Sequence, residues 1–276
     1  MRRVTLTPFR VGHCRHPQAM TIRGGRWAPV EFPALAFLIR HPAEGAILFD
    51  TGYDPAFFDA TRPFPERLYR WTTPPTLAPG EALAEQLAAA GVAPGQVRHL
   101  ILSHFHADHM AGTHRFPAAT IHAARAGWQA MGRGGRFAAV RQGMLRALAP
   151  PDFLSRARWF EDAPAVPLPR DLAPFEEGRD VIGDGSLLAV PLPGHCPGHW
   201  GLVLAEEGGA WRFLVADAAW SSAAIRTDTP PPWLTARLLG DASAGRATLR
   251  ALHRLHRRNP DVSLTPSHCA ECAAGL

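Results

Sequence analysis

The chain contains no lysine: all 29 of its basic residues are arginine. A catalytic lysine that forms a Schiff base with its substrate is therefore excluded. The net charge is +5, and the densest basic stretch runs from Arg125 to Arg158. The total avoidance of lysine indicates coding bias, so we expect no nucleic-acid partner. The basic stretch is interpreted either as a solvated helix face or as an anion-attracting rim over a pocket.

Cysteine is scarce, and long apolar runs are absent. Cys14, Cys196, Cys269 and Cys272 are too few and too scattered for the disulfide framework of a secreted chain of 276 residues. For the CxxC pair of Cys269 and Cys272, a structural zinc, a redox role and incidental thiols stay open as alternatives. No run approaches the roughly 20 apolar residues of a membrane span, and no signal-peptide core is apparent. We therefore expect a cytoplasmic protein with no membrane partner.

Hydrophobic residues make up 46% of the chain, which suffices for a sizeable core, and we expect one domain over residues 1–276. Apolar periodicity predicts strands at residues 4–9, 34–39, 46–49, 99–103, 120–122, 187–192, 200–205, 211–215 and 262–265, and helices at 81–90, 137–148 and 243–258. This order, strands then helix then strand and repeated once, indicates an α/β fold. We expect two β-sheets packed face to face with helices outside.

Two less regular segments interrupt this order, at about residues 53–79 and 127–174. The first carries many prolines and aromatic residues without clear periodicity, and the stretch 150–174 within the second is rich in proline and loop-like. We expect both segments to fold back like lids over a pocket, where they would shape the substrate site. The aromatic residues before Pro79 would serve equally well as a subunit interface, so the oligomeric state stays open.

The hexad HFHADH at residues 104–109 offers four metal-binding side chains within six positions. Imidazole and carboxylate are the ligands that borderline divalent ions such as Zn²⁺ prefer. The spacing suits no single face of a regular helix, so we expect a tight loop at the end of the strand at 99–103. Three further candidate ligands follow downstream. The complete predicted set is His104, His106, Asp108, His109, His195, Asp217 and His268.

A sensible division gives one ion His104, His106 and His195, and the other Asp108, His109 and His268, with Asp217 bridging both. Two ions in such a site can hold one hydroxide between them and polarise the bond that it attacks. We also expect two residues to support the ligands. Asp50, at the end of the strand at 46–49, would accept a hydrogen bond from a ligand imidazole, and His199 would orient a neighbour.

These motifs together resemble the metallo-β-lactamase superfamily. The matching segments are LFDTG at 48–52, SHFHADHMAG at 103–112, PGHCPGH at 193–199, VADAAW at 215–220 and PSHC at 266–269. The resemblance implies a four-layer αββα sandwich, in which two mixed β-sheets are flanked by helices. It also carries over all seven ligand positions, which implies two divalent metal ions per chain. Zinc is usual in that superfamily, and iron and manganese centres occur.

Within the superfamily the chain is most similar to the N-acyl homoserine lactonase group, whose GHC and GHCPGH segments occur here in the same order. It departs from that group at two positions. The lactonases carry a substrate-contacting tyrosine where this chain has Trp220, and they commonly carry aspartate where it has Cys269. Because an indole N–H donates but cannot accept, the particular lactone does not follow from the resemblance.

We therefore expect a hydrolase in which a bridging hydroxide attacks the carbonyl of a small ester or lactone. Asp108 or a metal-bound water would return a proton to the leaving alkoxide, and Trp220 would occupy the substrate-contacting position. The substrate would be a small molecule, either partly hydrophobic or anionic. One alternative is a phosphodiesterase that uses the arginines from Arg125 to Arg158. A second is a non-catalytic metal or redox sensor that uses His268, Cys269 and Cys272.

Overall fold

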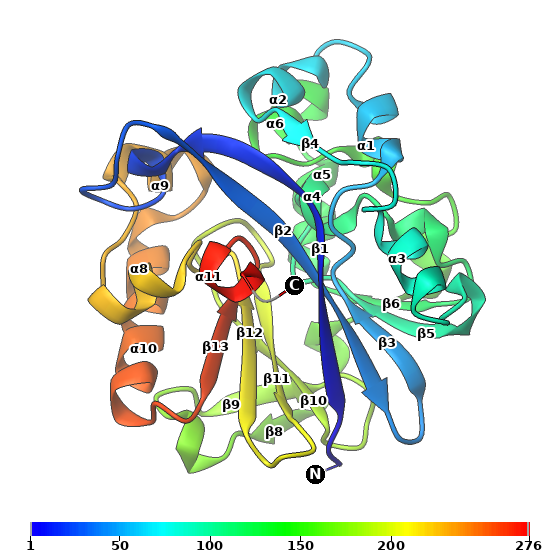
Figure 1. Ribbon diagram of the computed structural model, residues 1–276, viewed down its shortest axis with the longest axis vertical. Coiled ribbons are helices and arrows are strands. Elements are labelled where there is room, and N and C mark those ends of the chain that lie inside the picture. Colours follow the sequence, from blue (N-terminus) through cyan, green and yellow to red (C-terminus); the bar gives the residue numbers. More distant parts are fainter. Residues whose placement is uncertain (1, 275) are drawn as a thin grey trace.

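The computed structural model describes residues 2–274 and residue 276, and it contains two mixed β-sheets (Figure 1). The first sheet has the strand order β4-β1-β2-β3-β5-β6-β7, formed by β1 (Thr5–Pro17), β2 (Pro29–His41), β3 (Gly45–Phe49), β4 (Pro75–Thr76), β5 (Val97–Ile101), β6 (Thr120–Ala123) and β7 (Ala157–Trp159). The second has the order β13-β12-β11-β10-β9-β8, formed by β8 (Ala165–Pro167), β9 (Glu177–Asp180), β10 (Leu187–Pro191), β11 (Trp200–Ala205), β12 (Trp211–Ala216) and β13 (Ser263–Pro266). Each sheet combines antiparallel hairpins with parallel neighbours.

Helices flank both sheets. Those associated with the first sheet are α1 (Pro55–Ala60), α2 (Arg67–Thr72), α3 (Leu83–Ala89), α4 (Ala107–Met110), α5 (Arg125–Gly132), α6 (Gly135–Arg141) and α7 (Phe153–Arg156). The others are α8 (Ser222–Thr227), α9 (Trp233–Leu239), α10 (Ala242–Arg258) and α11 (Ala270–Ala273). Figure 1 shows α8 and α10 on the outer flank of the second sheet, opposite α1 and α3. No helix in the described part of the chain is long and apolar enough to cross a membrane.

Three apolar layers hold these elements together. The middle layer lies between the sheets, where Phe37 and Phe49 from the first sheet join a cluster with Leu202 and Leu214 from the second. An outer layer packs the helices on the first sheet, and another packs α8 and α10 on the second. Alternate residues of a strand point to opposite faces, which explains how β2 serves both the middle and an outer layer. The predicted four-layer αββα sandwich is confirmed.

Most predicted elements are confirmed, with bounds that shift by a few residues. The stretches 200–205 and 211–215 form the predicted hairpin, and the long helix predicted at 243–258 is α10. The helix predicted at 137–148 was wrong in its second half, because α6 ends at Arg141 and Gly143 follows with φ of +71°. The stretch 150–174 is less loop-like than expected, since α7, β7 and β8 lie within it. Strand β9 was missed because its sequence, EGRD, has no apolar period.

The segment 53–79, expected to be irregular, holds the helices α1 and α2 and the short strand β4. The side chain of Asp54 caps α1 by accepting a hydrogen bond from the backbone N–H of Ala56, and Pro55 occupies the first turn. Both features, the capping aspartate and the proline in the first turn, could be recognised in the sequence. The helices are six residues long, too short for a period to appear, and the packing of Phe57 against Tyr53 and Tyr69 holds them in place.

Candidate metal centre and substrate cleft

The seven predicted ligands meet at one edge of the sandwich, where strands from both sheets end. His104 and His106 follow β5, and Asp108 and His109 lie within the single-turn helix α4. The others follow β10, β12 and β13, and they are His195, Asp217 and His268. Open α/β sheets commonly place their ligand sites at the carboxyl ends of strands. Ala216, immediately before Asp217, has φ of +46°, a left-handed backbone that is rare outside glycine and occurs at functional sites.

The side chains gather into groups of metal-ligand size. Possible ligand atoms of His104, His106 and His195 lie within 4.8 Å of one another, as do those of Asp108, His109 and His268. These are the two groups into which the sequence divided the ligands.

Asp217 lies between the groups. Its Oδ2 atom is 3.2 Å from Nε2 of His195 and 3.2 Å from Nε2 of His268, and its Oδ1 atom is 3.3 Å from Nε2 of His109. One carboxylate therefore faces imidazoles of both groups, which suits a bridging ligand.

Neighbouring polar groups fix the Nδ1 atoms of three imidazoles. Nδ1 of His109 lies 2.8 Å from Oδ2 of Asp50, and Nδ1 of His268 lies 2.7 Å from the carbonyl oxygen of Pro33. Nδ1 of His104 is 2.9 Å from the hydroxyl of Ser103, which itself donates to Asp50. An acceptor at Nδ1 selects the tautomer whose Nε2 carries a lone pair, the form that binds a metal.

Buried atoms in the centre lack partners, and this allows a test of whether the residues fit a metal. Nε2 of His104, Nε2 of His109 and Oδ1 of Asp217 are buried and make no hydrogen bond among the described residues, although Nε2 of His109 and Oδ1 of Asp217 lie 3.3 Å apart. A buried polar atom without a partner costs free energy, about 1–3 kcal/mol, and these three atoms are of the types that bind metals. Nδ1 of His106 lies 3.0 Å from Nε2 of His195, so these two nitrogens face the same space. The donor set therefore fits two divalent ions.

The pKa values of the side chains in the centre shift in different directions. Burial lowers the pKa of His104 and His106 well below the usual value, and the neighbouring imidazoles add to the effect. Burial also opposes ionisation of His109 and Asp217, but the opposite charges around these two side chains outweigh it. Carboxylates, Asp217 first, raise the pKa of His109, while His268, His109 and His195 hold the pKa of Asp217 well below its usual range. The neutral imidazoles of His104 and His106 and the ionised carboxylate of Asp217 are in the protonation states that metal binding requires, whereas His109 would release its proton when a metal binds.

The two expected supporting residues lie next to the ligands. Asp50 is fully buried, and besides His109 it accepts hydrogen bonds from the backbone N–H and the hydroxyl of Ser103, each at 2.8 Å. Nε2 of His199 accepts a hydrogen bond at 3.1 Å from the backbone N–H of Asp217, and Nδ1 lies 3.0 Å from the carbonyl oxygen of Leu192. His199 thus fixes the backbone from which Asp217 projects.

Sequence reasoning missed the position of Cys196. A ligand atom of this buried residue lies within 4.8 Å of those of His104, His106 and His195, and burial raises the pKa of its thiol well above the usual value. The sequence signal that could have indicated this position is that Cys196 directly follows His195.

The CxxC pair lies beside Ser222. The Sγ atoms of Cys269 and Cys272 lie 3.2 and 3.5 Å from the hydroxyl of Ser222, and all four cysteine thiols of the chain are free.

A cleft of about 520 Å³ opens onto the centre. His106, Asp108, His195, Asp217 and His268 form its floor, and its walls come from the β1–β2 region, from α2 and the residues after it, from Trp220 and from α9. The wall residues are Cys14, His16, Met20, Thr21, Phe32, Tyr69, Thr72, Thr73, Gly143, Trp220, Thr235 and Leu238. Both predicted lid segments, 53–79 and 127–174, thus contribute to this lining.

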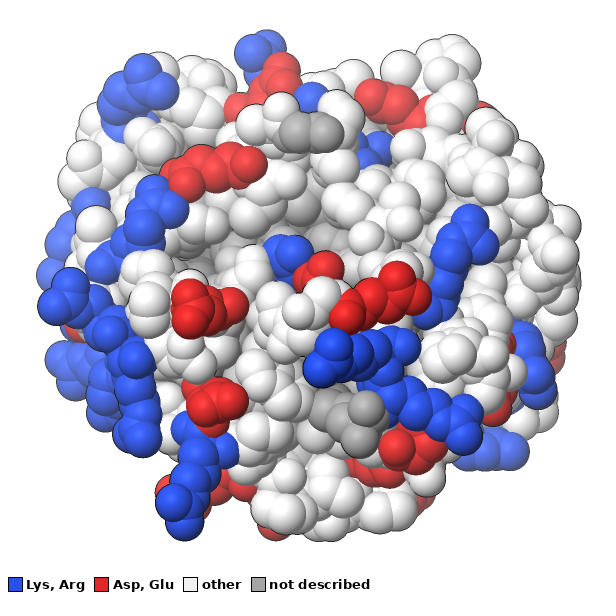
Figure 2. Space-filling view, turned by 60° about the horizontal axis from the view of Figure 1, so that its bottom comes forward, with Lys and Arg blue, Asp and Glu red and all other residues white. Residues whose placement is uncertain are grey.

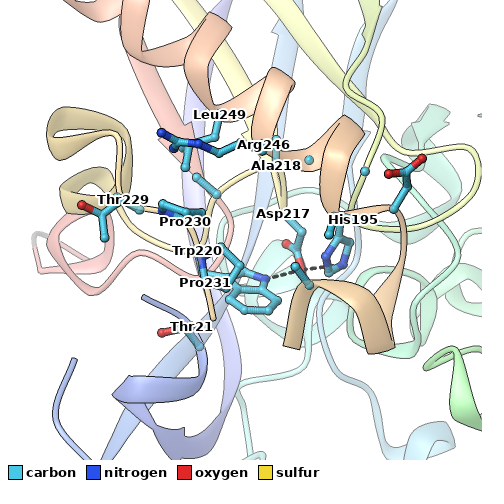
Figure 3. Close-up of a pocket in the computed structure, with 17 residues that line it drawn as sticks. Thr21, His195, Asp217, Ala218, Trp220, Thr229, Pro230, Pro231, Arg246 and Leu249 are labelled. Atoms are coloured by element: carbon cyan, nitrogen blue, oxygen red, sulfur yellow. Dashed lines mark hydrogen bonds and ion pairs between the residues drawn. The ribbon is translucent and has the colours of Figure 1, made fainter. Parts of the chain in front are cut away.

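Trp220 lines both this cleft and a smaller cavity of about 70 Å³, as do Thr21, His195 and Asp217. Figure 3 shows its indole beside Asp217 and His195, with Thr21 on the other side. The indole N–H donates a hydrogen bond to Oδ2 of Asp217 at 3.1 Å. The single donor of Trp220 is therefore committed to a ligand carboxylate.

The arginines between Arg125 and Arg158 do not line the cleft. Arg125 pairs with Asp162, Arg136 with Glu66 and Arg156 with Asp152. Of the described residues that line the cleft, none is arginine. Figure 2 shows basic side chains gathered along one edge of the molecule, and the outer helix α10 carries the exposed Arg250, Arg254, Arg257 and Arg258. Of the two interpretations of this stretch, the anion-attracting rim is not formed at the cleft by the described residues.

Comparison with known proteins places the chain in a family. Residues 29–258 match the profile of the metallo-beta-lactamase superfamily, and the chain belongs to it. A Mycobacterium tuberculosis protein named "Probable metallo-hydrolase" is 28% identical over 235 residues, covering 82% of this chain and 71% of that protein. The N-acyl homoserine lactonase AttM of Agrobacterium fabrum is 28% identical over 254 residues, covering 88% and 84%.

The fold has solved counterparts. An N-acyl homoserine lactone hydrolase with the product N-hexanoyl-L-homoserine bound at its catalytic metal centre superimposes with a TM-score of 0.74 at 17% identity, covering 100% of this chain and 97% of that one. Family, fold and the His/Asp cluster together define the chain as a metal-dependent hydrolase of the superfamily.

Proposed function

We propose that this protein hydrolyses a small, uncharged ester or lactone. The observation that carries the proposal is the cleft above the ligand cluster: its walls are apolar or neutral, apart from His16, and its volume of about 520 Å³ suits a small molecule. A phosphodiester would bring a negative charge into a space whose described lining holds no arginine. Within the ester class, the names of AttM and of the product-bound hydrolase favour lactones.

The ligand set proposed for two divalent ions is His104, His106, Asp108, His109, His195, Asp217 and His268. Zinc is the proposed metal, because imidazole and carboxylate ligands suit it. When bound, such ions supply Lewis-acid activation of water and of the substrate carbonyl.

The chain's own groups have distinct tasks. Asp50 and Ser103 hold the imidazoles of His104 and His109 in one tautomer and orientation. Asp108, on the floor of the cleft with Oδ2 at 3.3 Å from Nε2 of His268, is assigned the return of a proton to the leaving oxygen. Trp220 closes the wall beside Asp217 and restrains that carboxylate through its N–H.

The test is a hydrolysis screen of lactones, aryl esters, thioesters and bis(p-nitrophenyl) phosphate on protein of measured metal content. We expect lactones or esters to show the highest kcat/KM, and we expect His106→Ala to abolish that turnover. Higher turnover of the phosphodiester, or no turnover of any lactone or ester by metal-loaded protein, would refute the proposed function.

A further inference from the structure

We propose that the phenol of Tyr69 is the hydrogen-bond donor that the cleft presents to the reacting oxygen of the bound ester or lactone. The inference rests on the proposed function and adds a catalytic residue to it. Tyr69 lies on α2, in a segment remote in sequence from every metal ligand, and it lines the cleft together with Asp108 and His268. Hydrolysis of a carbonyl places negative charge on oxygen, and a preorganised donor stabilises that charge.

Four other neutral donors in the cleft are already engaged. The N–H of Trp220 donates to Asp217, and the hydroxyl of Thr21 donates to the carbonyl oxygen of Gln18 at 2.9 Å. The hydroxyl of Thr72 donates back to carbonyl oxygens of its own helix, and that of Thr73 is 3.2 Å from Nε2 of His16. A substrate that recruited any of these groups would have to break an existing hydrogen bond, which offsets the gain.

The chain has only two tyrosines, and they occupy different environments. Tyr53 is 1% exposed, and its hydroxyl is buried without a partner among the described residues. Tyr69 is partly buried, packs edge to face on Phe57 at 5.4 Å between ring centroids, and lines the cleft. Phe57 also contacts Tyr53, at 5.3 Å, so one ring separates the two phenols. Of the two, Tyr69 alone borders the substrate space.

The position of Tyr69 is fixed by a contact between the two lid segments. Arg136 of α6 forms a bidentate ion pair with Glu66, at 2.8 and 2.6 Å, and donates to the carbonyl oxygen of Phe64 at 2.8 Å. The rings of Phe64 and Phe137 pack edge to face at 5.5 Å. These contacts hold the start of α2, one turn before Tyr69, against α6, and so keep the phenol where a substrate would meet it.

The proposed role leaves the phenol protonated. The ordinary pKa of a tyrosine is about 10, so the side chain carries its proton at neutral pH. A neutral phenol donates a hydrogen bond and keeps its proton, so no covalent bond of Tyr69 is made or broken in this role.

The experiment compares Tyr69→Phe with Tyr53→Phe on a lactone that the wild type hydrolyses. Each variant loses one hydroxyl and keeps its ring, so packing is preserved. The matched control, Tyr53→Phe, removes a buried phenol oxygen that does not line the cleft. For Tyr69→Phe we expect kcat to fall about 100-fold with KM changed by less than about threefold. Metal content and Tm should match the wild type in both variants, and Tyr53→Phe should keep wild-type kcat.

Three results would overturn the role of Tyr69. These are a kcat for Tyr69→Phe within about twofold of the wild type, an equal loss in Tyr53→Phe, or a loss of kcat that follows lost metal. If kcat falls in Thr235→Val but not in Tyr69→Phe, the donor is the hydroxyl of Thr235 on α9 instead. The proposed function and the role of Tyr69 can be refuted separately. If the wild type hydrolyses no lactone or ester, both are refuted. If the wild type hydrolyses a lactone and Tyr69→Phe does so equally well, only the role of Tyr69 is refuted.

Discussion

Asp50 and His109 lie 59 residues apart in sequence, yet Oδ2 of the carboxylate is 2.8 Å from Nδ1 of the imidazole. The same carboxylate accepts from the hydroxyl of Ser103, which lies 2.9 Å from Nδ1 of His104. One buried aspartate therefore orients an imidazole in each of the two ligand groups. Its backbone φ of +59°, in the left-handed region, shows that the chain accepts local strain to place it there.

Replacement of Asp50 should weaken metal binding more than it changes the fold. In Asp50→Asn the amide nitrogen can face Nδ1 of His109 as a donor, which removes the preference for the metal-binding tautomer. We expect metal affinity to fall about 10- to 100-fold, as measured by chelator competition. Asp180→Asn is the matched control, because Asp180 is a buried carboxylate that accepts from the backbone of Gly183 and Gly185. Unchanged affinity in Asp50→Asn would contradict this role.

Trp220→Phe should have a mild effect on catalysis. The indole N–H is engaged with Asp217, so its loss removes one restraint on a bridging carboxylate but no donor to the substrate. We expect kcat to stay within about fivefold of the wild type and metal affinity to fall less than about tenfold. Steady-state kinetics and chelator competition measure both. A drop in kcat beyond about 100-fold at full metal content would show that Trp220 contacts the reacting atoms.

Gly194 is required where the loop carrying His195 crosses α10. It has φ of +130°, and a Cβ there would lie 2.1 Å from the backbone nitrogen of Gly245. Because backbone cannot retreat as a flexible side chain can, Gly194→Ala should cost more than about 3 kcal/mol in urea unfolding. Gly183→Ala, with φ of +82° in open space, should cost only about 1 kcal/mol. Equal losses in the two variants would exclude the steric explanation.

His122 should make the protein less stable in mild acid. Burial, with His99 and Arg158 adding to it, lowers the pKa of His122 from 6.5 to about 3. As the pH falls, His122 is protonated in the unfolded chain before it is protonated in the folded chain. Its contribution to the free energy of unfolding is therefore fully present above pH 6.5 and is lost as the pH falls toward 3. Between pH 7 and 4.5, metal-free wild type should lose about 2 kcal/mol more than His122→Gln. Parallel curves of unfolding free energy against pH would contradict this prediction.

The sequence was sufficient for the sandwich and for the grouping of the candidate ligands because both depend on short motifs. Buried strands such as β5 are continuous apolar runs, and the hexad 104–109 concentrates its ligands within one loop. The hairpin of β11 and β12 was equally visible from its Glu-Gly-Gly turn.

The walls of the cleft could not be predicted, because they depend on long-range packing of short elements. Nothing in the order of residues 53–79 indicates that Tyr69 meets the cleft, since its place is set by Arg136 pairing with Glu66, 70 residues away. Cys196 likewise reaches the imidazoles only through the fold of β5 against β10 and β11. The backbone N–H of Trp200 donates to the carbonyl oxygen of Ser103 and joins those two sheets at that point.

Anomalous diffraction from crystals of the metal-loaded protein, recorded at the absorption edge of the metal, tests the central claim most directly. We predict two peaks per chain, one among His104, His106 and His195 and the other among Asp108, His109 and His268, with Asp217 between them. A single peak, no peak, or peaks bound by other residues would contradict the dinuclear centre on which the proposed hydrolysis depends.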